Sequence, residues 1–178
     1  MSCAPATFWG VPVKVRKSWR ARGDAGAMQT LAEMRAMVQR SAVEPEIVSL
    51  ARVIVRPAAR GDRRGAAGLV RDWVSRHTRW TPDPEGAEYL VPPTVMLSRI
   101  ARAGLAPGDC DDVAVLAATL LKAAGIPARL TAIGFHPTRR LSHVTAEAMT
   151  GPGVWRELDT TRPAVTDARP ARALALRV

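Results

Sequence analysis

The chain has 178 residues, of which 47% are hydrophobic, and this size and composition suit one domain with a sizeable buried core. It has no run of about 18 apolar residues, and its N-terminus lacks a charged lead followed by a long apolar stretch, so neither a membrane span nor a signal peptide is indicated and we expect a cytoplasmic protein. The formal charge of +10 comes mostly from arginines scattered along the chain, which argues against a focused nucleic-acid surface.

Residues 1–25 predict a basic N-terminal arm. Lysines and arginines between Lys14 and Arg22 surround Trp19, and no acid occurs before Asp24. Such a segment could bind single-stranded nucleic acid, although a basic run is more often a solvated surface. A further use is docking on an acidic protein surface or on other copies in an assembly. Nucleic acid is therefore the less favoured partner.

Three amphipathic helices are predicted next. The first spans about 30–40 and opens with a capping box at Thr30. The second begins at Pro45, a residue suited to the first helical turn. The third begins at Asp62 and ends near His77, whose charge the helix dipole favours there, so we interpret this histidine as structural.

The proline-rich segment from Trp80 to Pro93 predicts an extended loop. Trp80 or Tyr89 could line a substrate cleft, or either could fill the core. A short helix over 94–103 is expected to lead the chain into the segment that contains Cys110.

Cys110 lies in Gly108-Asp109-Cys110-Asp111-Asp112, directly before a strongly amphipathic helix. Asp109 is the expected N-cap, with Asp112 as its return partner in a capping-box-like turn. Free N–H groups and the positive dipole at a helix start favour a thiolate, the nucleophilic form of cysteine. A lone cysteine is nevertheless more often a small buried residue, so the assignment depends on partners.

Three β segments follow this helix. The first covers 128–135. The second, Ser142–Met149, alternates strictly, so that His143, Thr145 and Glu147 share one face. The third, Val154–Asp159, comes after the turn signal Thr150-Gly-Pro-Gly153.

A hairpin loop of three or five residues would pair Asp159 with His143, Leu158 with Val144 and Val154 with Ala148. One face would then be apolar, and the other would carry an imidazole beside a carboxylate. Asp159 would fix the tautomer of His143 and leave the other ring nitrogen for the Cys110 thiol. His136, the rival base, has neither an alternating strand nor a partner carboxylate around it.

From Gly108 to Thr161 the chain resembles the transglutaminase-like superfamily of papain-type folds. The likeness rests on the helix-opening Gly108-Asp109-Cys110, on His143, on Leu158-Asp159-Thr160-Thr161 and on Gly125-Ile126-Pro127-Ala128-Arg129. It implies a Cys110 nucleophile, a His143 base and an Asp159 orienting group.

The chain departs from the family at Thr145, where the family often has an aromatic residue in the substrate-facing wall. The upstream helices and the stretch Trp80-Thr-Pro-Asp-Pro-Glu-Gly86 also resemble transglutaminase-like proteins encoded in phages and prophages.

The sequence therefore predicts an α+β, papain-like or transglutaminase-like domain over 26–161, in which N-terminal helices and the cysteine helix pack on a small antiparallel sheet, followed by an Ala/Arg/Pro-rich tail over 162–178. The predicted chemistry is acyl transfer on an amide of a protein or peptide substrate, through a thioester on Cys110. Water as acceptor gives hydrolysis and an amine gives transamidation. Two alternatives stay open: a catalytically idle member used as a structural or assembly protein, for example in a phage particle, and a nucleic-acid-binding protein.

No cofactor and no metal are expected, because two cysteines and three histidines without closely spaced ligand pairs make a poor zinc site. A disulfide between Cys3 and Cys110 is not expected either, since Cys3 falls in the arm.

Overall fold

The computed structural model describes residues 7–8, 11–12, 23–83, 89–137, 141–161 and 170–178. Most of the basic arm, with Cys3 and the segment Lys14–Arg22, lies outside the described residues, as does part of the Trp80–Gly86 stretch. Within the arm, β1 (Thr7–Phe8) and β2 (Val11–Pro12) form an antiparallel pair.

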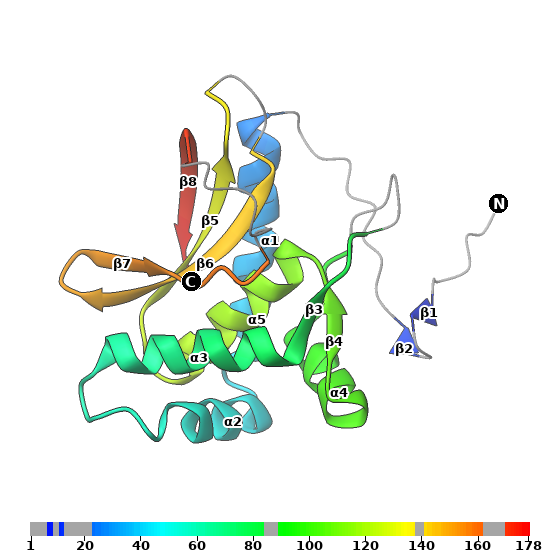
Figure 1. Cartoon of the computed structure of the whole chain (residues 1–178). Coiled ribbons are helices and arrows are strands. Elements are labelled where there is room, and N and C mark those ends of the chain that lie inside the picture. Colours follow the sequence, from blue (N-terminus) through cyan, green and yellow to red (C-terminus); the bar gives the residue numbers. More distant parts are fainter. Residues whose placement is uncertain (1–6, 9–10, 13–22, 84–88, 138–140, 162–169) are drawn as a thin grey trace.

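The helices occupy the lower and rear parts of the molecule (Figure 1). They are α1 (Asp24–Ser41), α2 (Pro45–Val55), α3 (Arg63–His77), α4 (Pro93–Ala103) and α5 (Cys110–Ala123). The start of α2 at Pro45 is confirmed. The predicted start of the third helix at Asp62 agrees to within one residue, because Asp62 is the N-cap of α3 and its carboxylate accepts from the backbone N–H of Gly65. None of the described helices is both long enough and apolar enough to span a membrane.

The predicted start of the first helix is wrong. α1 begins at Asp24, so Thr30 is an interior residue, and its hydroxyl donates to the carbonyl of Gly26 one turn earlier at 3.2 Å. A threonine inside a helix can satisfy its hydroxyl in this way without capping anything. The helix therefore also includes the last residues assigned to the basic arm of 1–25.

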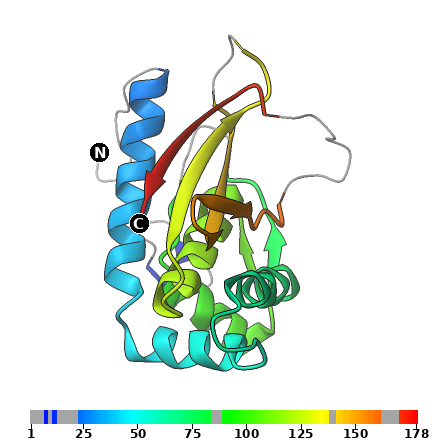
Figure 2. The same cartoon turned by 90° about the vertical axis from the view of Figure 1, so that its left-hand side faces the viewer.

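The main sheet confirms the predicted antiparallel architecture and has four strands in the order β7-β6-β5-β8 (Figure 2). These are β5 (Ala128–Gly134), β6 (His143–Gly151), β7 (Val154–Glu157) and β8 (Arg172–Arg177). A separate parallel pair joins β3 (Thr78–Trp80) to β4 (Ala106–Gly108), and the sequence predicts neither strand. Trp80, the first residue of the predicted loop of 80–93, is the last residue of β3.

Helix α5 is the centre of the core. Every residue from Asp111 to Leu121 is buried, because the sheet covers one side of this helix while α1, α2 and α3 cover others. On the sheet, the apolar side chains of alternating positions are buried, among them Leu130, Ala146 and Ala148. The helix that begins at Cys110 is thus packed on several sides by the rest of the molecule.

The C-terminal segment 162–178, predicted as a tail, includes a strand of this sheet. β8 pairs with β5, with Leu176 opposite Leu130 and Leu174 opposite Ala132, and Arg172 forms an ion pair with Asp24 of α1. The alternation Arg-Ala-Leu-Ala-Leu-Arg in 172–177 carries a period-2 signal that the Ala/Arg/Pro composition conceals.

Aspartate at Leu174 and Leu176 together is expected to lower the free energy of unfolding by about 3 kcal/mol or more, because both half-buried leucines pack against the core. Chemical denaturation measures this loss. Aspartate at the neighbouring exposed positions Ala173 and Ala175 adds the same charge to the same strand and should cost far less. Equal losses in the two double variants would contradict the pairing of β8 with β5.

Candidate functional site

Cys110 is the first residue of α5, as the sequence predicts. The side chain of Asp109 caps the helix, and its Oδ1 accepts from the backbone N–H groups of Asp111 and Asp112 at 3.1 and 3.3 Å. Asp109 is therefore confirmed as the N-cap, and it fixes the backbone on both sides of the sulfur.

Asp112 does not close a capping box, so that prediction is wrong. Its Oδ1 accepts from the backbone N–H of Val91 at 2.7 Å and so ties the loop before α4 to α5. Burial raises the pKa of the Asp112 carboxyl well above its usual range, although the bond from Val91 opposes this rise. Val91 is 21 residues away from Asp112 along the chain, so a capping rule that considers only near neighbours does not predict this hydrogen bond.

Gly108 is required by close packing around this carboxylate. A Cβ added at position 108 would lie 2.9 Å from the Cβ of Asp112 and 3.2 Å from the Cε of Met96. The glycine in the Gly-x-Cys motif thus leaves room for Asp112 beneath the nucleophile loop.

The Cys110 thiol lies in an environment that disfavours the thiolate. Burial raises the pKa of the Cys110 thiol above its ordinary value, and the negative charges of Asp111 and Asp109 raise it further, whereas a hydrogen bond from the Val144 backbone lowers it. The sulfur donates to Oδ1 of Asp111 at 3.5 Å. The helix dipole favours an anion here, but burial and two carboxylates oppose it, so the surroundings of the sulfur favour the neutral thiol.

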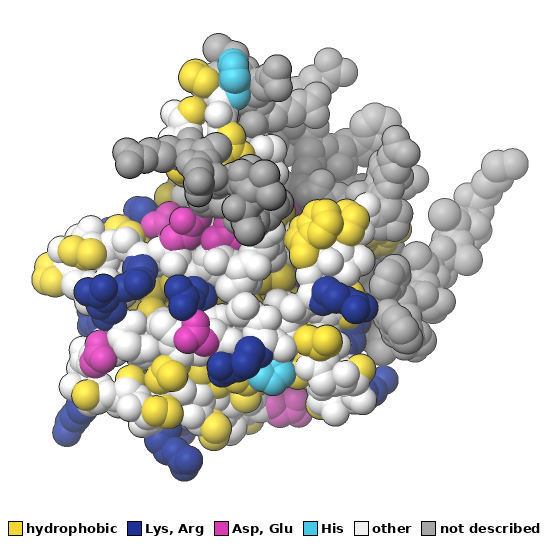
Figure 3. All heavy atoms as spheres, viewed as in Figure 1, with side chains coloured by type: hydrophobic (Ala, Val, Ile, Leu, Met, Phe, Trp, Pro, Cys, Tyr) yellow, Lys and Arg dark blue, Asp and Glu magenta, His cyan; other side chains and the backbone are white. Residues whose placement is uncertain are grey.

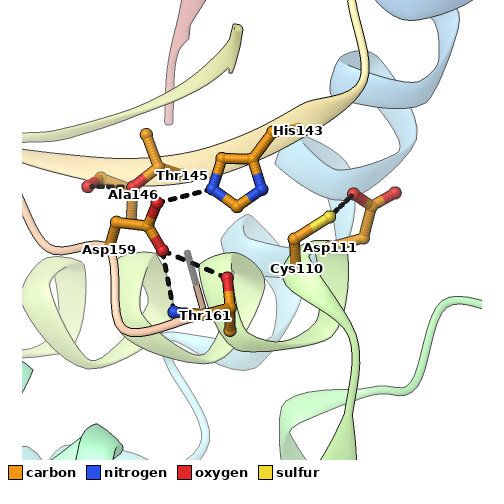
Figure 4. A network of polar contacts seen from close by, with 7 residues as sticks. All are labelled: Cys110, Asp111, His143, Thr145, Ala146, Asp159 and Thr161. Carbon is orange, nitrogen blue, oxygen red and sulfur yellow. Dashed lines mark hydrogen bonds and ion pairs between the residues drawn. The ribbon is translucent and has the colours of Figure 1, made fainter. Parts of the chain in front are cut away.

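His143 and Asp159 form a hydrogen-bonded pair, with 2.5 Å between His143 Nε2 and Asp159 Oδ2 (Figure 4). Both side chains are nearly buried, with exposed fractions of 11% and 7%. The other oxygen of Asp159 accepts from the backbone N–H of Thr161 at 2.8 Å and from its hydroxyl at 3.1 Å. Burial raises the pKa of Asp159, but the bonds from His143 and Thr161 and the charge of His143 outweigh it and lower this pKa to about 2.

The hairpin register differs from the predicted one by two residues. The loop has two residues, Pro152 and Gly153, and a bulge follows between Gly151 and Met149. The Leu158 N–H therefore donates to the Ala146 carbonyl at 2.9 Å instead of pairing with Val144, and Val154 is 58% exposed instead of opposing Ala148.

The same register places Asp159 diagonal to His143, beyond the end of β7. Side chains alternate between faces with a period of two, so a shift of two positions keeps His143 and Asp159 on one face. The contact predicted from the wrong register is therefore present in the structure.

The imidazole of His143 lies between Asp159 and Cys110 (Figure 4). Nε2 faces the carboxylate, and the second nitrogen, Nδ1, faces the side on which the cysteine lies, while the sulfur is turned toward Asp111. A narrow crevice without room for a water molecule runs between α5 and the strands here, and Cys110, Thr145 and Asp159 are among the residues that line it. Cys110 at the start of α5 and Asp159 beyond the end of β7 thus line one crevice, and the ring of His143 from β6 lies between them.

The two other histidines and Trp80 are not among the residues that line the Cys110 crevice. His136 is exposed beyond the end of β5, and His77 hydrogen-bonds through Nδ1 to the Trp73 carbonyl at 2.8 Å, in agreement with its structural interpretation. Trp80 is 57% exposed and stands opposite Gly108 in the β3–β4 pair, so it does not fill the core. The sequence contains no clear signal for this parallel pair, because each strand has three residues.

Ligand atoms of Asp109, Cys110 and Asp111 lie within 4.8 Å of one another, a spacing that a metal ion could bridge. The Asp109 carboxylate already caps α5, and Asp111 accepts from the thiol. Both carboxylates therefore already have partners within the protein. That the mechanism needs no metal stays a prediction.

Asparagine at Asp159 is expected to lower the free energy of unfolding near neutral pH by about 2–3 kcal/mol, the linkage value of a carboxyl whose pKa falls from about 3.9 to about 2. A group whose pKa is lowered by folding stabilises the protein above its unfolded pKa, and this stability is lost as the pH falls. The difference between wild type and Asp159→Asn should therefore shrink between about pH 4 and pH 2 in urea titrations. A difference that does not change with pH would contradict this account.

Comparison with known proteins gives one family match and two fold matches. The transglutaminase-like superfamily matches residues 49–160. The structure of a "putative protease" from Parabacteroides distasonis superposes with a TM-score of 0.61 and 14% identity, over 94% of this chain and 34% of that one. The structure of a "putative cysteine protease" from Cytophaga hutchinsonii superposes with a TM-score of 0.52 and 19% sequence identity, over 81% of this chain and 51% of that one. This chain therefore spans about a third and a half of those proteins, and no curated protein matches it.

Proposed function

Since the chain belongs to the transglutaminase-like superfamily, we propose that it is a cysteine-dependent acyl-transfer enzyme acting on amides of proteins or peptides. Cys110 is the nucleophile, His143 the general base and acid, and Asp159 the orienting group. The observation that carries this proposal is the His143–Asp159 hydrogen bond through Nε2, which leaves Nδ1 on the side of Cys110, where it can accept the thiol proton (Figure 4).

Attack begins from a neutral thiol. The Cys110 Sγ forms a bond to the amide carbonyl carbon while its proton passes to Nδ1 of His143. Asp159 stabilises the resulting imidazolium through Nε2. The carbon–nitrogen bond then breaks, Nδ1–H protonates the leaving amine, and a thioester remains on Cys110. Water or an amine, deprotonated by His143, releases the acyl group and regenerates the thiol.

The N-terminus of α5 offers a donor for the developing oxyanion. Asp109 takes the backbone N–H groups of Asp111 and Asp112 with its side chain and that of Val113 with its carbonyl. Of the first four N–H groups of the helix, that of Cys110 is left to face the carbonyl under attack. This N–H moves with the nucleophile, so attack and oxyanion binding share one rigid element.

Asp111 holds the thiol in its resting position, so Asp111→Asn is expected to make Cys110 more acidic. The variant removes the nearer negative charge and replaces the charged acceptor of the thiol bond with a neutral amide oxygen. The midpoint of the pH dependence of iodoacetamide alkylation should shift to lower pH by about one unit, a shift that corresponds to roughly 1.4 kcal/mol. Peptide mapping measures alkylation at Cys110 separately from Cys3.

The matched control is Asp109→Asn, which removes one charge from the same turn but keeps a capping side chain and accepts nothing from the thiol. It should produce the smaller shift. Equal shifts in both variants would mean that charge alone sets the acidity of the thiol.

The test of the function itself is acylation by p-nitrophenyl acetate followed by mass spectrometry. The proposal expects one acetyl group on Cys110, none in Cys110→Ala, and normal labelling in Cys3→Ala. Release of the acetyl group by water or by an added primary amine then distinguishes hydrolysis from transamidation. If Cys110 acquires no acetyl group under conditions that acetylate a free cysteine peptide, the idle-fold alternative replaces this proposal. The likeness to phage-encoded members and the partner of the basic arm stay predictions.

A further inference from the structure

A second cavity lies between α3 and β7, apart from the Cys110 crevice, and encloses about 230 Å³. Three of the side chains that line it are arginines: Arg64 and Arg71 from α3 and Arg156 from β7. We propose that this cavity binds a small oxyanion, a phosphate or carboxylate group, between the three guanidinium groups. Figure 3 shows basic side chains gathered over the face where β7 meets α3.

The charges of the cavity favour an anion. Arg71 already has a partner in Asp72, at 2.7 Å on the surface. No hydrogen bond or ion pair joins Arg64 or Arg156 to any carboxylate of the described residues. Glu157 is the one acidic residue of the lining, so arginine charge predominates. Arginine presents its N–H groups in a planar fork that matches the oxygens of carboxylate and phosphate, and two such forks facing one cavity form a recognisable anion site.

The fold places these three arginines around one cavity. Arg64, Gly68 and Arg71 are spaced i, i+4 and i+7 along α3, which places them on one face of the helix. Arg156 stands opposite Ala148 in the β6–β7 register, so its side chain leaves the sheet on the face where Ala148 is buried. Helix and strand therefore contribute cations from opposite walls.

Gly68 keeps the floor of the cavity open. A Cβ at this position would meet no atom within 4 Å, so packing does not explain a glycine in the interior of α3. Gly65 is different, since a Cβ there would collide with the carboxylate of Asp62 that caps the helix. Glycine is the least favoured helix residue after proline, and here its missing side chain gives a ligand access to the space between two arginines.

Arg63 and Arg64 both lie in the first turn of α3, where the helix dipole is positive and basic side chains are unfavourable. The Asp62 carboxylate caps this helix end and supplies one negative charge there. An oxyanion held by Arg64 would supply a second.

The experiment is isothermal titration calorimetry of the full chain with inorganic phosphate and, separately, with glutarate at low ionic strength. Each substitution Arg64→Ala and Arg156→Ala should weaken binding by roughly tenfold or more, as expected for loss of a charge-assisted hydrogen bond. Gly68→Leu should abolish binding by filling the cavity while leaving the circular dichroism spectrum unchanged. Arg63→Ala is the matched control, because it removes the same charge from the same turn without lining the cavity, and it should bind nearly normally.

Tighter binding of phosphate identifies a phosphate site, and tighter binding of glutarate identifies a carboxylate site. The proposal is overturned if neither anion binds, or if binding survives Gly68→Leu or falls equally in Arg63→Ala. Cys110→Ala should bind as the wild type does, so this result is independent of the acyl-transfer chemistry.

Discussion

Replacing His143 with alanine is expected to slow acylation of Cys110 by about 10²- to 10⁴-fold, the usual contribution of a general base. The loss should be large here because burial and the neighbouring carboxylates raise the pKa of the Cys110 thiol and so favour its neutral form. A protein that cannot rely on a preformed thiolate depends on the imidazole to remove the proton during attack. Stopped-flow measurement of p-nitrophenolate release from p-nitrophenyl acetate gives the acylation rate.

His136→Ala is the control for this measurement, because this exposed histidine lies outside the Cys110 crevice and its loss should leave the rate unchanged. The rate of the His143→Ala variant should also rise in direct proportion to hydroxide concentration, since solvent then replaces the missing base. Equal acylation rates in wild type and His143→Ala would remove His143 from the mechanism.

Alanine at Gly108 is expected to lower the free energy of unfolding by about 2–3 kcal/mol, the usual cost of overpacking a tight site. Its Cβ would lie 2.9 Å from the Cβ of Asp112, a group that the backbone of α5 holds in place and that cannot swing away. Relief requires the nucleophile loop to move, so acylation of Cys110 should fall as well. Urea denaturation and the p-nitrophenyl acetate assay measure the two effects.

Gly68→Ala is the matched control for this substitution. It makes the same change in α3, where a Cβ meets no atom within 4 Å, and it should raise the free energy of unfolding by up to about 1 kcal/mol through helix propensity. Opposite signs at the two glycines are the expected result. A neutral effect at Gly108 would contradict the close approach of Asp112.

Rules about near neighbours in the sequence predict the helix cap of the site correctly, but tertiary contacts overrule what they predict for the acidity of the thiol. Asp109 caps α5 as a helix start demands, and this places Cys110 at the first helical position. The prediction of a stabilised thiolate follows from the same local rule, but it ignores the carboxylate of Asp111 and the strand packed on the sulfur. Burial and charge from neighbours change a pKa by more than a helix end does.

Near-neighbour chemistry in the sequence determines most of the helices, the antiparallel β segments and the order of the candidate residues. Pro45, Asp62 and Asp109 mark helix starts because caps and first-turn prolines act on atoms within three or four residues. The alternation in β6 keeps His143 and Asp159 on one face even in a different register, since a period of two survives a shift of two.

Contacts between distant segments decide the rest. Some groups come close to one another only when the chain folds. Examples are the hydrogen bond from Val91 to Asp112, the pairing of β8 with β5 and the register set by the two-residue hairpin loop. The neutral state of the Cys110 thiol and the arginine cavity have the same origin, because burial and electrostatic environment depend on which surfaces pack together. The sequence identifies these groups, but their pKa values and their binding partners depend on distances that exist only in the folded protein.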